Sequence, residues 1–153
     1  MSRQSQGVPV IAPKAVLVLP TGTTALSSEV HANRLLVLST SNALYTLNLP
    51  RATGSGDVYE FLSTLGHTSN IVINAVGVAP SNQFVGTIWQ HTSANTLTQF
   101  SSTTNDIITL NQTTTGGAGV GDYLKLMDTA PNQWRVVFGL FTTSGDQATP
   151  FSG

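Results

Sequence analysis

The segment TLNLPRATGSGDVYEFL, residues 46–62, decides the fold that this sequence predicts. Apolar and polar residues alternate on both sides of a glycine-rich break, with Leu47 and Leu49 before it and Tyr59 and Phe61 after it. Alternation with a period of two is typical of β-strands that bury one face. Glycine readily adopts the positive φ that a tight turn needs. The segment therefore predicts a strand, a turn and a second strand.

The glycine-rich break, Gly54-Ser55-Gly56-Asp57, also has the composition of a phosphate-binding loop. A dinucleotide-binding fingerprint needs a third glycine three residues after the second, at the start of a helix. That position is Tyr59, which lies in a predicted strand, and no Gly-Lys-Ser/Thr of a P-loop occurs in the chain. We therefore interpret Gly54, Gly56 and Asp57 as structural turn residues, with the Asp57 side chain accepting hydrogen bonds from turn amides.

The pattern of this segment occurs a second time in the chain. Residues 109–126 repeat Thr-Leu-Asn, a glycine-rich stretch and Gly-x-Gly-Asp ahead of an alternating strand. The turn residues of this copy are Gly119, Gly121 and Asp122, and Asp122 has the role expected of Asp57. The aligned copies predict these strand positions: inward Tyr59, Phe61, Leu124 and Leu126, outward Glu60 and Lys125. We interpret the copies as a pair of hairpins within one sheet.

Short strands separated by Gly, Asn, Ser or Pro are expected along most of the chain. They cover residues 14–19, 34–39, 43–49, 57–63, 70–75, 84–90, 96–100, 106–111, 122–128 and 134–142. Residues 24–36 have the one weak helical pattern. The sequence therefore predicts an all-β domain, a single antiparallel β-sandwich or barrel, and leaves strand order and sheet closure open.

Residues 1–22 are predicted to form an extended N-terminal arm, and residues 23–153 the all-β domain. Three prolines in the arm forbid a continuous helix and favour extended backbone. The apolar residues between them need a covering partner. The predicted capsid or subunit interface residues are Val8, Pro9, Val10, Ile11 and Pro13. The longest apolar run, residues 15–19, is too short for a secretory signal or a membrane span, so we expect no membrane association.

Charge is scarce in this chain. Six basic and seven acidic side chains make up 8% of the 153 residues, against about 25% in an average soluble domain. The basic residues are scattered, so we expect no nucleic-acid partner. A nearly neutral surface fits a protein that works in an assembly, and it fits equally a threonine-rich β protein with neutral faces. Without cysteine, the chain has neither a disulfide nor a thiolate metal ligand.

No residue pattern in the sequence indicates catalysis. Asp57 and Glu60 point to opposite faces of one strand, and Asp122 and Asp128 lie about 20 Å apart at the usual strand rise. Neither pair has the separation of about 5–10 Å that glycosidase carboxyls need, although pairing across strands stays open. The three histidines lack metal-ligand spacing, and no Gly-x-Ser-x-Gly elbow marks a nucleophile. We predict no enzyme activity, no catalytic residue, no metal and no cofactor.

Aromatic residues suggest two interpretations. The side chains of a possible sugar-stacking platform are Trp89, His91, Trp134, Tyr45 and Tyr123. Alternatively, Trp134, Val136 and Phe138 form one inward row of the last long strand, since aromatic residues fill β cores efficiently. The second interpretation is preferred.

An ordered series of motifs extends over residues 43–151. Its members are TLNLPRATGSGDVYEFL (46–62), HTSNIVINAVG (67–77), DIITLNQTTTGGAGVGDYLKLMDTAPNQWRVVFG (106–139) and ATPF (148–151). The series resembles tailed-bacteriophage capsid decoration (cement) proteins and related virion structural proteins. The resemblance does not include the first 40 or so residues, where the mode of attachment would reside.

The resemblance implies a location in the virion, on the capsid surface. The protein would bind the outer head surface and stabilise contacts between capsomers. Its partners would be the major capsid protein and further copies of itself, as a homo-oligomer in which a trimer is favoured over a dimer. The alternative is a receptor- or glycan-binding module associated with a virion fibre or tail.

Overall fold

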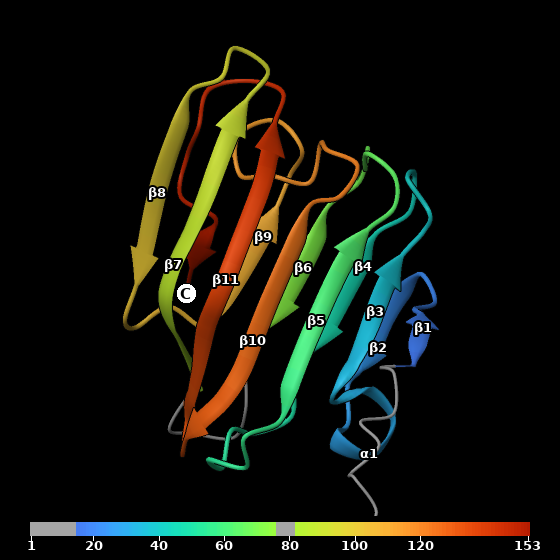
Figure 1. Cartoon of the computed structure of the whole chain (residues 1–153), viewed down its shortest axis with the longest axis vertical. Helices are drawn as coiled ribbons and strands as arrows, with labels where there is room; N and C mark the ends of the chain where they lie inside the picture. The colour runs from blue at the N-terminus through green and yellow to red at the C-terminus, as the bar shows by residue number, and fades with distance from the viewer. Residues whose placement is uncertain (1–14, 76–81) are drawn as a thin grey trace, which may run out of the picture.

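The structure, a computed structural model, describes residues 15–75 and 82–153. Their strands form two sheets that lie face to face, with the larger sheet in front in Figure 1. The larger sheet contains, in order, β1 (Val16–Val18), β3 (Arg34–Leu38), β5 (Val58–Ser63), β10 (Tyr123–Ala130), β11 (Gln133–Thr143), β7 (Gln83–Thr92) and β8 (Leu97–Ser102). The smaller sheet contains, in order, β12 (Phe151–Ser152), β9 (Ile107–Leu110), β6 (Ile71–Asn74), β4 (Tyr45–Asn48) and β2 (Gly22–Ala25). The predicted all-β sandwich is confirmed.

Strand pairing within the sheets is mixed rather than antiparallel throughout, which corrects one part of the predicted fold. β1–β3, β3–β5, β2–β4, β4–β6 and β7–β11 are parallel pairs. From β1 to β6 the chain crosses to the other sheet after every strand, so every second strand returns to the same sheet in the same direction. The sequence does not reveal this arrangement, because a strand with one buried face alternates in the same way whichever direction its neighbour runs.

Helix α1 (Ser28–His31) lies inside the segment 24–36 that has the helical pattern. Ser27 caps it, because its hydroxyl accepts a hydrogen bond from the Val30 amide at 3.4 Å. β2 and β3 occupy the two ends of that segment. No helix in the described part of the chain is long and apolar enough to cross a membrane.

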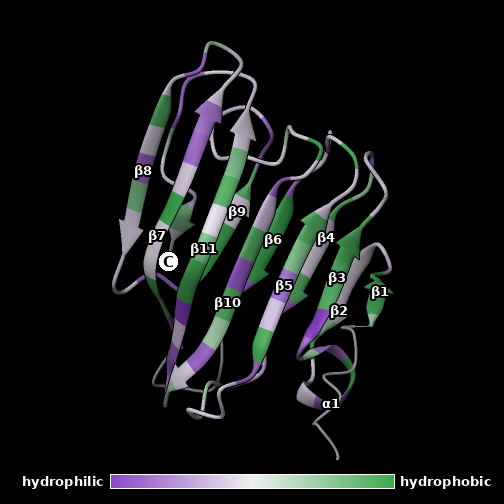
Figure 2. Cartoon of the chain, in the orientation of Figure 1, coloured by the Kyte–Doolittle hydropathy of each residue, from purple (hydrophilic) through white to green (hydrophobic). Residues whose placement is uncertain are grey.

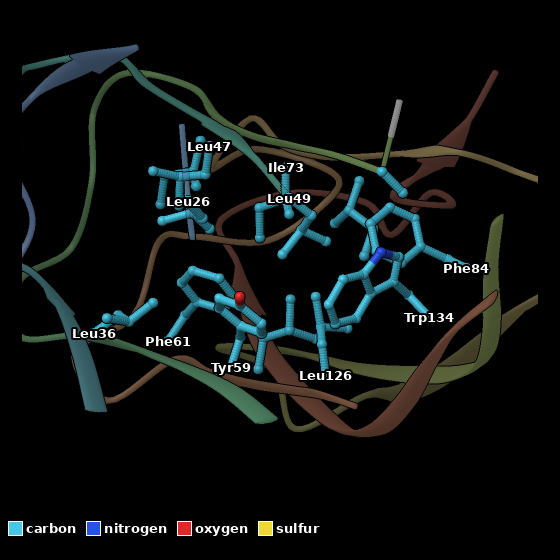
Figure 3. Packing of buried hydrophobic residues seen from close by; sticks show 14 of the residues in the cluster. Leu26, Leu36, Leu47, Leu49, Tyr59, Phe61, Ile73, Phe84, Leu126 and Trp134 are labelled. Carbon is cyan, nitrogen blue, oxygen red and sulfur yellow. The ribbon is translucent and has the colours of Figure 1, made fainter. Parts of the chain in front are cut away.

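The hydrophobic core lies between the two sheets and is built from inward side chains of both (Figure 3). Leu47 and Ile73 come from the smaller sheet, and they face Tyr59, Leu126 and Trp134 of the larger one. The Tyr59 and Trp134 rings meet edge to face, with centroids 5.4 Å apart and planes at 82°. Burial of side chains of this size contributes about 1.5–3 kcal/mol each.

β5 and β10, the strands that end the two copies of the repeated pattern, are antiparallel neighbours. Their register pairs Tyr59 with Leu126, Phe61 with Leu124 and Glu60 with Lys125. The four residues predicted to point inward are at most 3% exposed, so these positions are confirmed. The copies are not hairpins, however, since β4 and β9 belong to the smaller sheet. Each glycine-rich stretch carries the chain from one sheet to the other, and each is longer than a usual hairpin loop of about 2–5 residues.

A β-bulge in β11 determines the face on which Phe138 lies. Trp134 and Val136 point inward as predicted and are 1% and 5% exposed. The register of β11 with β10 then shifts, which leaves Val137 as the extra residue. Phe138 therefore points outward and is 45% exposed. The predicted inward row was wrong at this residue.

Candidate functional site

The predicted interface residues of the arm, Val8, Pro9, Val10, Ile11 and Pro13, lie outside the described residues. The later part of the predicted arm is described. Val16–Val18 forms β1 and pairs in parallel with β3, and Leu19 is 2% exposed in the core. The first strand of the described chain is therefore an edge strand of the larger sheet.

The outer face of the larger sheet carries a continuous apolar row across six strands. The strand registers place side by side, from β1 to β7, the residues Val18, Val37, Leu62, Tyr123, Leu140 and Trp89. These six residues are called the apolar row below. Val18 is 57% and Trp89 37% exposed, Leu62, Tyr123 and Leu140 are partly exposed, and Val37 is 7% exposed. Hydrophobic colour covers β1, most of β3 and the middle of β11 in Figure 2. An exposed apolar surface of this kind marks a site of interaction.

One ion pair lies in the next row of the same face. Lys125 Nζ is 3.3 Å from Glu60 Oε1, and these side chains are 32% and 11% exposed. Burial, followed by the negative charge of Glu60, raises the pKa of Tyr123 above its ordinary value. The Phe138 ring lies against Tyr123 with a centroid distance of 6.0 Å. The centre of this face therefore combines apolar and aromatic side chains with a pair of charges that cancel.

The outer face of the smaller sheet has a different chemistry. Thr46, Asn48, Asn74 and Thr109 are partly exposed on strands whose alternate residues are buried. The Asn74 amide donates a hydrogen bond to Asn48 Oδ1 at 2.8 Å. Val72 and Ile107 are partly exposed among them, so this face is neutral and mostly polar, as an ordinary solvated sheet is. The apolar row thus distinguishes one face of the sandwich from the other.

The structure divides the possible sugar-stacking platform between surface and core. Trp89 and Tyr123 lie on the outer face, separated within the apolar row by Leu140. Trp134 is 1% exposed and Tyr45 is fully buried, so neither can stack on a ligand from solvent. The preferred interpretation of Trp134 as a core residue is confirmed.

The first glycine-rich turn connects β4 to β5. Gly54 and Gly56 have φ values of 83° and 81°, as the turn interpretation requires. Asp57 accepts a hydrogen bond from the Ser28 hydroxyl of α1. The amides of the turn bind a different carboxylate, so the role predicted for Asp57 was wrong.

Asp128, at the far end of β10, holds this first turn in place. Its carboxylate, 3% exposed, accepts hydrogen bonds from the Gly54 amide at 2.6 Å, the Thr53 amide at 2.9 Å and the Ser55 hydroxyl at 2.9 Å. Burial by itself raises the pKa of Asp128, but these hydrogen bonds outweigh it and hold the pKa below its ordinary value.

Asp122 holds the second turn in the way that the sequence predicts. It accepts hydrogen bonds from the amides of Gly117 at 3.0 Å and Gly119 at 3.3 Å, and from the Thr142 amide and hydroxyl, both at 2.9 Å. Gly121 has a φ of 89°. Here burial dominates, and it raises the pKa of Asp122 despite these hydrogen bonds.

The Thr142 hydroxyl joins Asp122 to a histidine of the neighbouring strand. His91 Nε2 lies 2.9 Å from Thr142 Oγ1. Because the hydroxyl donates its proton to Asp122, it can only accept from His91. In a nucleophilic triad the hydroxyl donates to the imidazole and the carboxylate binds the other ring nitrogen, so this order is different. The described residues contain no group of three or more His, Asp or Glu placed to hold a metal ion.

Two hollows accompany these residues. An interior void of about 10 Å³ lies between the sheets beside Phe61 and Phe141, which is room for about one water. A shallow surface hollow of about 300 Å³ is lined by residues 92–94, 96 and 144–147, at the lower limit of small-molecule sites. The apolar row is therefore the more prominent feature of the surface.

His67 predicts an acid-sensitive contribution to stability. It is 3% exposed with its ring edge against Tyr45, centroids 5.7 Å apart, and burial lowers its pKa against a smaller opposing effect of the Thr40 backbone. The unfolded chain therefore binds more protons below about pH 6.5, and stability should fall as the pH drops from there through the lower folded pKa. Urea unfolding measures the free energy of unfolding between pH 7.5 and 5. This free energy should fall less steeply in His67→Phe than in the wild type, and some fall should remain because His31, whose pKa is also lowered, still titrates. An unchanged slope would contradict the assignment to His67.

No protein-family model, curated protein or solved structure matches this chain. The geometry offers a surface for contact: an apolar row, a neutralised ion pair beside it, and two turns fixed by buried aspartates. The aspartates hold the connections between the sheets, and the apolar row is the part of the described surface suited to a partner.

Proposed function

We propose that this protein is a capsid decoration protein, which binds the outer surface of a phage head and stabilises the contacts between capsomers. The observation that carries the proposal is the outer face of the larger sheet, where the apolar row crosses six strands beside one ion pair. A protein that acts by contact needs such a surface. The motif series of residues 43–151, which resembles decoration proteins, supports the same function.

Attachment to the major capsid protein is assigned to the arm. Val8, Val10 and Ile11 are apolar residues among prolines, the composition of an extended segment that inserts into a groove or adds to a sheet edge. The chain enters the sandwich at the edge strand β1, so an arm docked elsewhere would leave the sheet face unobstructed. Repetition of one modest contact over a shell supplies avidity.

Deletion of residues 1–13 should reduce loading onto heads that lack the protein by at least about tenfold. The deletion removes the same contact from every copy, so the avidity that repetition supplies is lost as well. The deletion ends before β1, so the melting temperature of the domain should hardly change. Co-sedimentation with purified heads measures loading, and a chain with Ser2 and Gln4 replaced by alanine is the matched control. Full loading of the truncated chain would refute attachment by the arm.

Salt provides an independent check on the kind of contact. With so few charges to screen, loading should persist as sodium chloride rises from about 0.1 to 1 M. A steep loss of binding over this range would favour an electrostatic mode of attachment and would count against the proposal.

A glycan-binding module of a fibre or tail is the second candidate, and the exposed indole of Trp89 favours it. Trp89 has Gln99 beside it on β8, so an exposed aromatic ring lies next to an amide that can both donate and accept hydrogen bonds. Adsorption should then fall after Trp89→Ala, and a glycan array should show binding. Many copies spread over the head, with adsorption unaffected by Trp89→Ala, would favour the decoration protein instead.

A further inference from the structure

We propose that the outer face of the larger sheet is a two-fold interface with a second copy of this chain. This inference goes beyond the proposed function and does not rest on it, because it concerns the free protein. Three features of this face fit a two-fold interface: the order of its residues, the placement of its charges and its area.

The charge pair at the centre of the face is complementary to itself. Glu60 on β5 and Lys125 on β10 lie side by side, 3.3 Å apart. A two-fold axis parallel to the strands and midway between β5 and β10 exchanges the two positions. It would place Glu60 of each copy over Lys125 of the other. Each charge would then have a partner across the interface as well as within its own chain, which makes orientation specific.

The same axis also matches the apolar row with itself. The axis divides the six strands β1-β3-β5-β10-β11-β7 into two halves of three. It therefore places β3 of one copy opposite β11 of the other, and β1 of one copy opposite β7 of the other. In the apolar row, this pairs Leu62 with Tyr123, Val37 with Leu140, and Val18 with Trp89. An isologous interface needs one patch that is complementary to itself. Five exposed or partly exposed apolar positions of the row satisfy this requirement together, while Val37, 7% exposed, adds little contact area.

Strand β8, at the edge of the larger sheet beyond β7, has no strand of the second copy opposite it. It carries Gln99 in line with the apolar row and Ser101 beside it. Both residues are exposed and polar, as expected of a rim, and Leu97 at the start of the strand is the exposed apolar residue on this side of β8. Packed sheets cross at about 30° because of their twist, so the pairs nearest β5 and β10 should match best and those at the edges least.

The area sets the expected strength of the interface. Six strands about 4.8 Å apart span about 29 Å, and five residues of strand cover about 17 Å, which gives about 500 Å² per copy. The total of about 1,000 Å² is near the lower limit for a specific interface. A reversible dimer with a dissociation constant on the order of 1–100 µM is therefore expected. The trimer that the resemblance implies stays a prediction.

The test measures the mass of the full chain in solution between about 1 and 500 µM by sedimentation equilibrium, a range that brackets the expected constant. The wild-type chain should pass from monomer to dimer. Leu140→Lys should weaken the dimer at least tenfold, because it buries a charge within the apolar row, between Tyr123 and Trp89. Thr109→Lys, on the outer face of the smaller sheet, is the matched control and should leave the dimer unchanged. Trp89→Lys tests the same surface if Leu140→Lys does not fold.

A mixture of two charge variants tests the axis itself. In the Glu60→Lys chain, positions 60 and 125 are both lysine, and in the Lys125→Glu chain both are glutamate. Neither variant therefore keeps an attractive charge pair within its own chain. Each alone should dimerise at least tenfold more weakly than the wild type, while an equimolar mixture should recover a heterodimer, because opposite charges then face each other. A wild-type chain that stays monomeric, a dimer insensitive to Leu140→Lys, or a mixture of folded variants that stays monomeric would overturn the proposal.

Discussion

Asp128→Asn should lower the free energy of unfolding by about 3 kcal/mol, since hydrogen bonds to a buried charged group are worth about 1.5–3 kcal/mol each and several are affected. Both carboxylate oxygens of Asp128 accept hydrogen bonds from the first turn, including the Gly54 amide at 2.6 Å. Asparagine offers one acceptor oxygen, and its NH₂ group would face an amide donor. The urea midpoint measures the loss. Asp57→Asn is the matched control, because the Asp57 side chain accepts its hydrogen bond from the Ser28 hydroxyl at the exposed surface, and it should cost less than about 1 kcal/mol.

The pH dependence of stability identifies the charge of Asp128 as the cause. Its folded pKa lies below the unfolded value, so the contribution is present above about pH 4 and is lost as the pH falls through the lower folded pKa. Asp122 cannot supply this loss, because its pKa is raised and its protonation therefore favours the folded state. Wild-type protein should lose stability below about pH 4 more steeply than Asp128→Asn. Parallel curves would show that the carboxylate charge is not what holds the turn.

The sequence predicted strands well wherever one face is buried and the other is not. Tyr59 and Phe61 on β5 and Leu124 and Leu126 on β10 alternate with other residues, and the repeated pattern correctly placed them on one inward face. β12 could not be found in this way, since two residues are too short to show alternation. Strand direction also could not be read, because it depends on the path of the chain between the sheets.

The candidate site was harder to predict, because it depends on pairing between distant strands. Asp128 is 74 residues from the Gly54 amide that it binds, and nothing local to either residue indicates this contact. A bulge turned Phe138 outward, and a period-two pattern has no means of anticipating an extra residue. The apolar row did leave a signal: Leu62 and Leu140 each stand beside an inward phenylalanine, so their strands are apolar on both faces. Such runs indicate a strand covered on both sides.

Gly119→Ala should cost about 3 kcal/mol or more, because the added methyl group has no room and would disrupt the contacts of a buried carboxylate. A Cβ at this position would overlap Thr142 Oγ1 and would lie 2.6 Å from Asp122 Oδ1. Gly121→Ala, two residues away, is the control: its φ of 89° strains alanine by about 1 kcal/mol, but no atom lies within 4 Å of its Cβ. Thermal and urea unfolding of both variants measure the difference. Equal losses would mean that Asp122 and Thr142 can move apart at little cost, and that the second turn is held by its backbone alone.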